Sequence, residues 1–421
     1  MRNMLKLHTL KAKNGDCLVL EFGKSKEPNR ILIDGGPDGV YNEFLRPYLT
    51  SLGWGANFDL VVASHVDDDH MNGLLALLED LKGYGTKLVK IKEIWHNSLE
   101  YKIKSNGKID AKLKKSSKIK KRGSDDYVDK DFQKFWIDSD EYFYELFDKY
   151  ASENKDVNFI RPSFATRSIK QGDDFRRLAK LHKIPINKRF RSSLITIERK
   201  KPYVDIGNIR IDIIGPSQKH LDRLMKAWLK WVEKNADKLK EQTVRAVAKS
   251  DKSIPNLSSI MFLVREKGKE PNQYGKSILF TGDGRGDYII EGLKDRNLLG
   301  KNNIIKVDIL KLPHHGSNYN VVAPNLFDVI QAKYYVASGD NEYDNPHADT
   351  LTMIAKAAKK QKNRKITFCF TYNNTKQINK FKKRCPQGTE KRKYNYCIKT
   401  IKSKKNYFTI DLSNKRTKVI E

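Results

Sequence analysis

The segment His65-Val66-Asp67-Asp68-Asp69-His70 places two imidazoles and three carboxylates within six residues. Three adjacent acidic side chains repel one another unless cations neutralise them, and imidazole together with carboxylate suits Zn²⁺, Mn²⁺ or Fe. In a turn after a strand, His65 and Asp67 can face one metal while Asp69 and His70 face another. The alternative interpretation is a solvated acidic loop that happens to contain histidines.

Three later segments each place a possible metal ligand directly after an expected strand. They are Thr281-Gly282-Asp283, Pro313-His314-His315-Gly316-Ser317 and Asp344-Asn345-Pro346-His347. Functional groups of α/β folds collect at the carboxyl ends of sheet strands. A single Gly-Asp carries no information, but four such strand ends in order favour a metal site over an acidic loop.

These motifs resemble the metallo-β-lactamase superfamily, most closely the soluble hydrolase domain of ComEC-like competence proteins and their free-standing relatives. The shared motifs are Gly15-Asp16, Asp34-Gly35-Gly36, His65 to His70, Thr281 to Asp283, Pro313 to Ser317, Pro346-His347 and a serine-containing turn at Asn256 to Ser259. The resemblance covers roughly residues 1–96 and 205–360. It implies an α+β fold, the αββα sandwich of two mixed sheets flanked by helices, here with two basic insertions.

The resemblance also implies two metal positions that share one carboxylate. His65 and Asp67 would bind the first metal, Asp69 and His70 would bind the second, and Asp283 would bridge them. The commonest loop of the superfamily has a histidine where this chain has Asp67, so the first position is expected to be richer in oxygen. We therefore expect two divalent ions, Zn²⁺ or Mn²⁺, with Mg²⁺ also compatible.

Further residues would complete or support these positions. One of His314 and His315 would complete the second position, and the sequence does not decide which. Asp34 would orient a ligand histidine through a hydrogen bond. Asn256 and Ser258 stand where the superfamily often has a metal-binding histidine, and they would belong to the same supporting layer.

The implied reaction is hydrolysis by a metal-activated hydroxide, with Asp69 and Asp283 holding the metals. His347 would contact a phosphate or protonate the leaving group. His96, after an expected strand from Ile91 to Ile94, is a candidate replacement ligand for the first metal. A lone histidine at a strand end is more often structural.

The net charge of +31, from 82 Lys and Arg against 51 Asp and Glu, indicates a polyanionic partner such as nucleic acid or a nucleotide. A lysine-rich genome would produce the same composition without that meaning. This positive charge attracts the anionic substrate of a phosphodiesterase, whereas it gives a lactonase or thioesterase no such advantage. We therefore expect a metal-dependent phosphodiesterase, foremost a nuclease acting on DNA or RNA. The alternatives are a phosphodiesterase for small or cyclic nucleotides or phosphorylated polymers, and a nucleic-acid-binding subunit with vestigial catalysis.

The segment from Lys102 to Arg122 is the strongest basic run, with ten Lys or Arg and one acid. It is a candidate nucleic-acid-binding arm, and a solvated linker is an equally simple interpretation. The candidate contacts are Lys112, Lys114, Lys115, Lys118, Lys120, Lys121 and Arg122.

Hydrophobic spacing indicates the elements that must position these residues. We expect residues 1–97 to form the first half of the fold and 98–204 a basic, largely helical insertion. Residues 205–365 would form the second half, with a helical insertion at 218–252, and 366–421 a basic C-terminal extension. The site loops would follow strands near Leu60 to Ala63, Ser277 to Phe280, Val307 to Leu312 and Lys333 to Ala337, with helices at Asn42 to Leu52, Leu74 to Leu81, Phe175 to Leu181 and Thr350 to Lys360.

Cysteine usage and hydropathy indicate a compartment. Cys17, Cys369, Cys385 and Cys397 form no CxxC pair, which is typical of reduced thiols in a cytosolic protein. No apolar run approaches the ~20 residues of a membrane span. The sequence therefore predicts a cytoplasmic location without a transmembrane segment.

Overall fold

The structure is a computed structural model. It describes residues 4–83, 88–97, 163–221, 258–318, 320–321, 326–340, 342–388, 390, 393–402, 404–414 and 417–420. Four expectations fall wholly or mostly outside these residues. They are Asn256, residues 98–162 of the insertion expected at 98–204, most of the insertion at 218–252, and the basic residues Lys112, Lys114, Lys115, Lys118, Lys120, Lys121 and Arg122.

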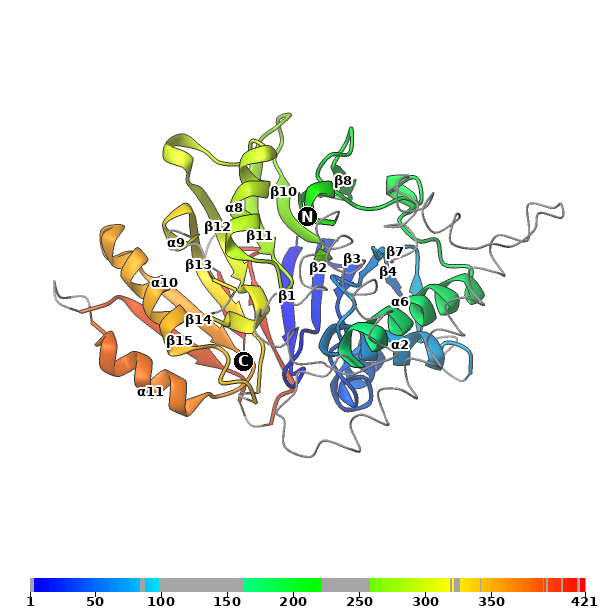
Figure 1. Ribbon diagram of the computed structural model, residues 1–421, viewed down its shortest axis with the longest axis horizontal. Coiled ribbons are helices and arrows are strands. Elements are labelled where there is room, and N and C mark those ends of the chain that lie inside the picture. The colour runs from blue at the N-terminus through cyan, green and yellow to red at the C-terminus, as the bar shows by residue number, and fades with distance from the viewer. Residues whose placement is uncertain are drawn as a thin grey trace, which may run out of the picture.

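Two mixed β-sheets form the centre of the described molecule (Figure 1). The seven-stranded sheet has the order β17-β16-β1-β2-β3-β5-β7, and the eight-stranded sheet has the order β15-β14-β13-β12-β11-β10-β9-β8. A short pair, β4 (Ala56–Phe58) and β6 (Val89–Ile91), stands apart. The sheet strands are β1 (Met4–Leu10), β2 (Leu18–Lys24), β3 (Glu27–Ile33), β5 (Leu60–Val62), β7 (Ile94–Trp95), β8 (Tyr203–Ile206), β9 (Ile209–Gly215), β10 (Met261–Lys267), β11 (Tyr274–Phe280), β12 (Ile305–Lys311), β13 (Ile330–Ala337), β14 (Ile366–Phe370), β15 (Tyr396–Thr400), β16 (Tyr407–Asp411) and β17 (Lys418–Ile420).

The inner faces of the two sheets pack against each other through alternating apolar side chains. Leu5 and Leu7 of β1 share one buried cluster with Ile211 of β9, Phe262 of β10 and Ile278 of β11, all at most 1% exposed. Alternate residues of a strand face one side of a sheet, so this period-two pattern commits one face of each sheet to the interior.

Helices cover both outer faces. The short π-helical turn at Tyr41–Leu45, α1 (Arg46–Ser51), α2 (Asp68–Asp80) and α6 (Ser163–Leu181) pack on the seven-stranded sheet. The helices α8 (Gly286–Asp295), α9 (Leu326–Val329), α10 (Ala348–Lys360) and α11 (Thr375–Arg384) pack on the eight-stranded sheet (Figure 1). The layers therefore run helix, sheet, sheet, helix, which confirms the expected αββα sandwich of two mixed sheets flanked by helices.

Two elements differ from the sequence expectation. Helix α2 begins at Asp68 and not near Leu74, because Asp67 is extended and the acidic first turn suits the positive end of a helix dipole. Residues 366–421, expected as an extension, supply β14 and β15 to the eight-stranded sheet and β16 and β17 to the seven-stranded sheet.

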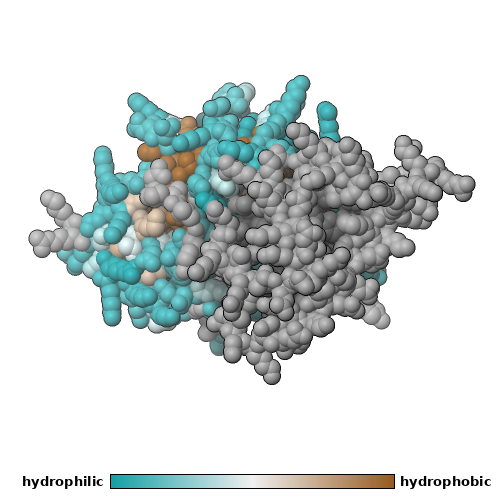
Figure 2. All heavy atoms as spheres, viewed as in Figure 1, coloured by the Kyte–Doolittle hydropathy of each residue, from teal (hydrophilic) through white to brown (hydrophobic). Residues whose placement is uncertain are grey.

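The surface of the described residues is mostly hydrophilic in the view of Figure 2, with a small hydrophobic area near α8. Within the described part of the chain, no helix is both long enough and apolar enough to cross a membrane.

Candidate metal centre

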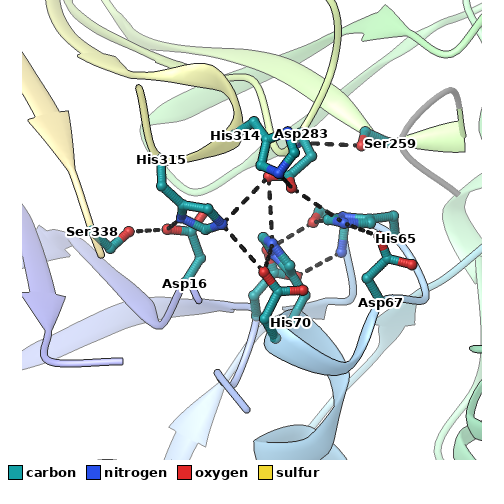
Figure 3. Close-up of polar contacts among 12 residues, drawn as sticks. Asp16, His65, Asp67, His70, Ser259, Asp283, His314, His315 and Ser338 are labelled. Carbon is teal, nitrogen blue, oxygen red and sulfur yellow. Dashed lines mark hydrogen bonds and ion pairs between the residues drawn. The ribbon is translucent and has the colours of Figure 1, made fainter. Parts of the chain in front are cut away.

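Sharp turns at the ends of strands bring the motif residues together at one edge of the sandwich (Figure 3). Gly282 after β11 has φ 47°, and His314 and His315 after β12 have φ 46° and 54°. Asp34 after β3 has φ 58°. Left-handed backbone is uncommon for residues other than glycine, and Asn, Asp and His tolerate it better than most. These turns redirect the chain so that the polar side chains face the centre.

Asp283 lies at the middle of the cluster, and each of its carboxylate oxygens faces two imidazoles. Oδ1 is 3.4 Å from Nε2 of His70 and 3.9 Å from Nε2 of His315. Oδ2 is 3.7 Å from Nε2 of His65 and 3.6 Å from Nε2 of His314. The four histidines are therefore divided into two pairs by one carboxylate.

Each pair of imidazoles has a second carboxylate beside it. Oδ2 of Asp67 is 3.5 Å from Nε2 of His65, whereas Oδ2 of Asp69 is 3.7 Å from Nε2 of His70 and 3.4 Å from Nε2 of His315. The result is two groups of two nitrogens and two oxygens. The first group is His65, Asp67, His314 and Asp283, and the second group is Asp69, His70, His315 and Asp283.

The histidine pair after β12 is divided between these groups, which the sequence left open. His315 Nε2 lies in the second group, and His314 Nε2 lies in the first. The sequence suggested a first position poor in nitrogen because Asp67 replaces a histidine. His314 supplies a second nitrogen there, since after two consecutive left-handed residues the two rings face different carboxylate oxygens of Asp283.

Several polar atoms of the cluster are buried without a hydrogen-bond partner. They are Nε2 of His65, His70 and His315, Nδ1 of His315, and Oδ1 of Asp283. A buried unsatisfied polar group costs roughly 1–3 kcal/mol, so converging lone pairs of this kind call for a cation. The residues therefore fit metal ions.

The charge balance leads to the same conclusion. Among the described residues, five carboxylates and one lysine lie within ion-pair range of the four imidazoles or of one another. With neutral imidazoles the cluster has a charge of −4, which two divalent cations would balance. The carboxylates are Asp16, Asp34, Asp67, Asp69 and Asp283, and the lysine is Lys311.

Electrostatics hold the central carboxylate, Asp283, ionised. Burial would raise the pKa of Asp283, but the neighbouring imidazoles, with His314 first and His70 and His315 next, outweigh burial and keep that pKa well below its usual value. Burial would lower the pKa of His315, yet Asp16 and Asp283 raise it to about 9. Metal ions must therefore compete with protons for these nitrogens, which is the usual coupling of metal affinity to pH.

Asp34 and Ser64 support the two histidines of the loop after β5. Oδ1 of Asp34 accepts the backbone N–H of Ser64 at 2.7 Å, and Oδ2 accepts the Ser64 hydroxyl at 2.7 Å and Nδ1 of His70 at 2.8 Å. The Ser64 oxygen is also 3.0 Å from Nδ1 of His65. Asp34 thus contacts a histidine of the cluster. Ser64 was not singled out in the sequence, because a serine before a histidine has no distinctive pattern.

Residues near β10 and β12 support Asp283 and His314. Ser258 is buried, but the hydroxyl that accepts the backbone N–H of Asp283, at 3.3 Å, belongs to Ser259. Nδ1 of His314 is 2.7 Å from Oδ1 of Asn320, whose amide donates to the Asp283 carbonyl at 3.0 Å. No sequence signal distinguishes Asn320 from the other asparagines of the chain.

Two further histidines have other surroundings. His347 precedes α10, its backbone N–H bonds to Gly316 at 3.2 Å, and its Nδ1 is 2.5 Å from Oδ1 of Asn318. His96 is buried and lies edge-on to Phe175 with ring centroids 5.6 Å apart. His347 therefore lies beside the loop that carries His314 and His315, whereas His96 packs against α6.

No protein-family model and no curated protein matches the sequence. Among solved structures, a long-form RNase Z from yeast is similar with 11% sequence identity and a TM-score of 0.38. The match covers 99% of this chain and 49% of that chain, so this chain spans about half the length of that RNase Z.

Proposed function

We propose that the chain is a binuclear metal-dependent phosphodiesterase whose substrate is DNA or RNA. The observation that carries the proposal is the Asp283 carboxylate, each oxygen of which faces two imidazole nitrogens at 3.4–3.9 Å. The first metal would be held by His65, Asp67, His314 and Asp283, and the second by Asp69, His70, His315 and Asp283. Sets of two nitrogens and two oxygens suit Zn²⁺ or Mn²⁺, and Mg²⁺ remains compatible with the carboxylates.

When bound, the two ions would lower the pKa of a water molecule and stabilise negative charge on the attacked phosphodiester. The residues of the chain hold and orient this chemistry. Asp283 and Asp69 place carboxylate oxygens between the imidazoles, and Asp34 fixes the ring of His70 through Nδ1. His347, with Nδ1 directed at Asn318, would present its other ring nitrogen to the substrate, as a contact to a phosphate or as the proton donor to the leaving group.

The choice of nucleic acid as substrate is supported by the net charge of +31. Positive charge neutralises backbone phosphates and releases counterions, which gives a polyanion much more binding energy than a small ester receives. The basic residues between Lys112 and Arg122 are the proposed contacts to the nucleic acid. A phosphodiesterase for small nucleotides would use the same metal centre, and a binding subunit with vestigial catalysis would use the charge alone.

The test compares wild type with Asp283→Asn after loading with Mn²⁺ or Zn²⁺. The substrates are single-stranded DNA, duplex DNA, RNA and cyclic dinucleotides. We expect wild type to cleave a nucleic acid and Asp283→Asn to lose this activity, because the shared carboxylate loses its charge. Asp308→Asn is a matched control, since Asp308 is also buried on this sheet but contacts Ser277 and Lys333.

Three results would contradict the proposal. If wild type and Asp283→Asn behave alike on every substrate, the cluster performs no phosphodiester hydrolysis. Cleavage of cyclic dinucleotides alone would favour the small-nucleotide enzyme. Fewer than one bound divalent ion per chain after gentle purification would favour a binding subunit with vestigial catalysis.

A further inference from the structure

The four histidines of the cluster direct the same ring nitrogen, Nε2, toward the centre, and their Nδ1 atoms contact partners of different charge. At the first group these partners are neutral. Nδ1 of His65 is 3.0 Å from the Ser64 hydroxyl, and Nδ1 of His314 is 2.7 Å from the amide oxygen of Asn320.

At the second group both partners are carboxylates. Nδ1 of His70 is hydrogen-bonded to Oδ2 of Asp34 at 2.8 Å. Nδ1 of His315 makes a longer ion-pair contact, 3.4 Å, with Oδ1 of Asp16 (Figure 3). A carboxylate behind a ligand histidine fixes the tautomer and makes the metal-facing nitrogen more basic, and its loss typically weakens metal affinity 10–100-fold. The second group therefore has the stronger donors.

A buried lysine balances the negative charge of Asp16, so the carboxylate can stay ionised beside His315. Lys311, the last residue of β12, is 1% exposed, and its Nζ lies 2.6 Å from Oδ2 of Asp16 and 2.9 Å from the Leu312 carbonyl. The Ser338 hydroxyl donates to Oδ1 of Asp16. Asp16 lies with His70, Asp283 and His315 in a set whose possible ligand atoms are all within 4.8 Å of one another. Both of its oxygens are engaged by Lys311 and Ser338, so Asp16 acts on His315 as a positioning residue and not as a fourth metal-binding carboxylate.

Exposure differs between the groups at one imidazole. The His70 and His315 side chains of the second group are 0% and 2% exposed and His65 of the first group is 0% exposed, whereas His314 of the first group is 32% exposed. Water can compete for a metal beside an exposed imidazole more easily than beside two buried ones. A partly exposed ligand also loses more side-chain freedom when it binds.

We propose that the two metal positions are unequal: the second, backed by Asp34 and by the buried Asp16–Lys311 pair, binds its metal tightly, and the first, backed by Ser64 and Asn320, binds an exchangeable metal. This rests on the proposed binuclear function. The activity of the chain then depends on the concentration of free metal through the first position, while the second position stays occupied.

The test is a titration of the demetallated full-length chain, with Zn²⁺ followed by calorimetry and Co²⁺ followed by absorbance. We expect two steps with dissociation constants at least tenfold apart. His315→Ala should remove the tight step, and His314→Ala the weak step. Two equal steps, or loss of the tight step in His314→Ala, would overturn the proposal.

Two designed changes test the cause of the inequality. Asp16→Asn together with Lys311→Met removes both charges of the buried pair, and it should weaken the tight step 10–100-fold without changing the weak one. Asn320→Asp should strengthen the weak step about tenfold, a gain that misfolding cannot imitate. The paired control, Asp308→Asn with Lys333→Met, removes an Asp–Lys contact of 2.8 Å between β12 and β13 and should change neither step.

The remaining outcomes are also decisive. If neither the double change nor Asn320→Asp alters any step, the ring partners do not set metal affinity and the proposal is wrong. Complete loss of the tight step in Asp16→Asn alone, with loss of its Co²⁺ absorption, would make Asp16 a ligand and overturn its positioning role. Two unequal steps in a chain that cleaves no phosphodiester would refute only the proposed function, whereas a wild-type chain that binds no divalent metal would refute both.

Discussion

Replacing Asp34 with asparagine should weaken metal binding at the second position while leaving the fold intact. Asp34 is 1% exposed and accepts three hydrogen bonds at 2.7–2.8 Å, two from Ser64 and one from His70. Its backbone has φ 58°, a conformation that asparagine tolerates as well as aspartate does. The substitution therefore changes one oxygen to an amide nitrogen without straining the turn.

The size of the effect follows from the two orientations open to the new amide. With its nitrogen toward His70, the ring must give up its Nδ1 proton and present Nε2–H to the metal, which blocks binding. With its nitrogen toward the Ser64 backbone N–H, two donors meet, at a cost of roughly 1–3 kcal/mol. We expect the affinity of the tight step to fall about 10–100-fold, which corresponds to about 1.4–2.7 kcal/mol.

The assay is calorimetric Zn²⁺ titration with thermal unfolding measured in parallel. Asp59→Asn is the matched control, because Asp59 is 4% exposed and contacts Asn29, Arg30 and Lys92 away from the cluster. The control should lose stability and keep both titration steps. Unchanged titration of Asp34→Asn, or equal weakening in both variants, would refute the assignment of Asp34 as the partner that fixes His70.

Three other changes test different parts of the structure. Gly15→Ala should abolish metal binding, because the new Cβ would lie 1.8 Å from the Asp69 carbonyl oxygen; Gly83→Ala, which meets nothing within 4 Å, should bind metal normally in the same titration. Burial would raise the pKa of Glu21, but His8 and Arg30 outweigh burial and lower that pKa from 4.5 to about 2. Ionised Glu21 should therefore stabilise the fold by about 3 kcal/mol above pH ~4.5, and this contribution should vanish toward pH ~2. Urea unfolding of Glu21→Gln should therefore show a deficit at pH 7 that shrinks in acid, and a deficit independent of pH would contradict this. Nucleic-acid affinity should fall with a log–log salt slope of about −0.9 per phosphate contacted, whereas a slope near zero in filter binding would exclude a backbone-binding surface.

The sequence predicted those features of the site that depend on the order of residues along the chain. His65, Asp283 and His315 each follow a buried strand, so their convergence at one edge of the sandwich could be expected. The αββα architecture was implied by the resemblance of these motifs to the metallo-β-lactamase superfamily and not by the alternation of strands and helices alone. The start of α2 could not be placed, because the acidic run at Asp68 reads equally well as a loop and as a helix N-terminus.

The side chains that contact the ligand histidines could not be predicted in this way, because they come from segments that are distant in the sequence. Ser338 bonds to Asp16 across 322 residues of sequence, and Asp34 bonds to His70 across 36. Asp16 belonged to a recognisable Gly-Asp turn, yet nothing in the turn shows that a lysine of β12 would meet it. Strand order and register determine such contacts, and no single motif contains that information.

The turn after β12 determines which metal group each of His314 and His315 joins. A helical or extended continuation after β12 would direct consecutive side chains differently, whereas two left-handed residues place one ring beside each carboxylate oxygen of Asp283. This geometry gives both groups two nitrogens and brings four imidazoles around a single carboxylate. The neutral partner of His314 and the anionic partner of His315 then make the two groups unequal, although the residues are adjacent in the chain. The asymmetry of the centre therefore arises from backbone conformation at two positions and from the strands that surround them.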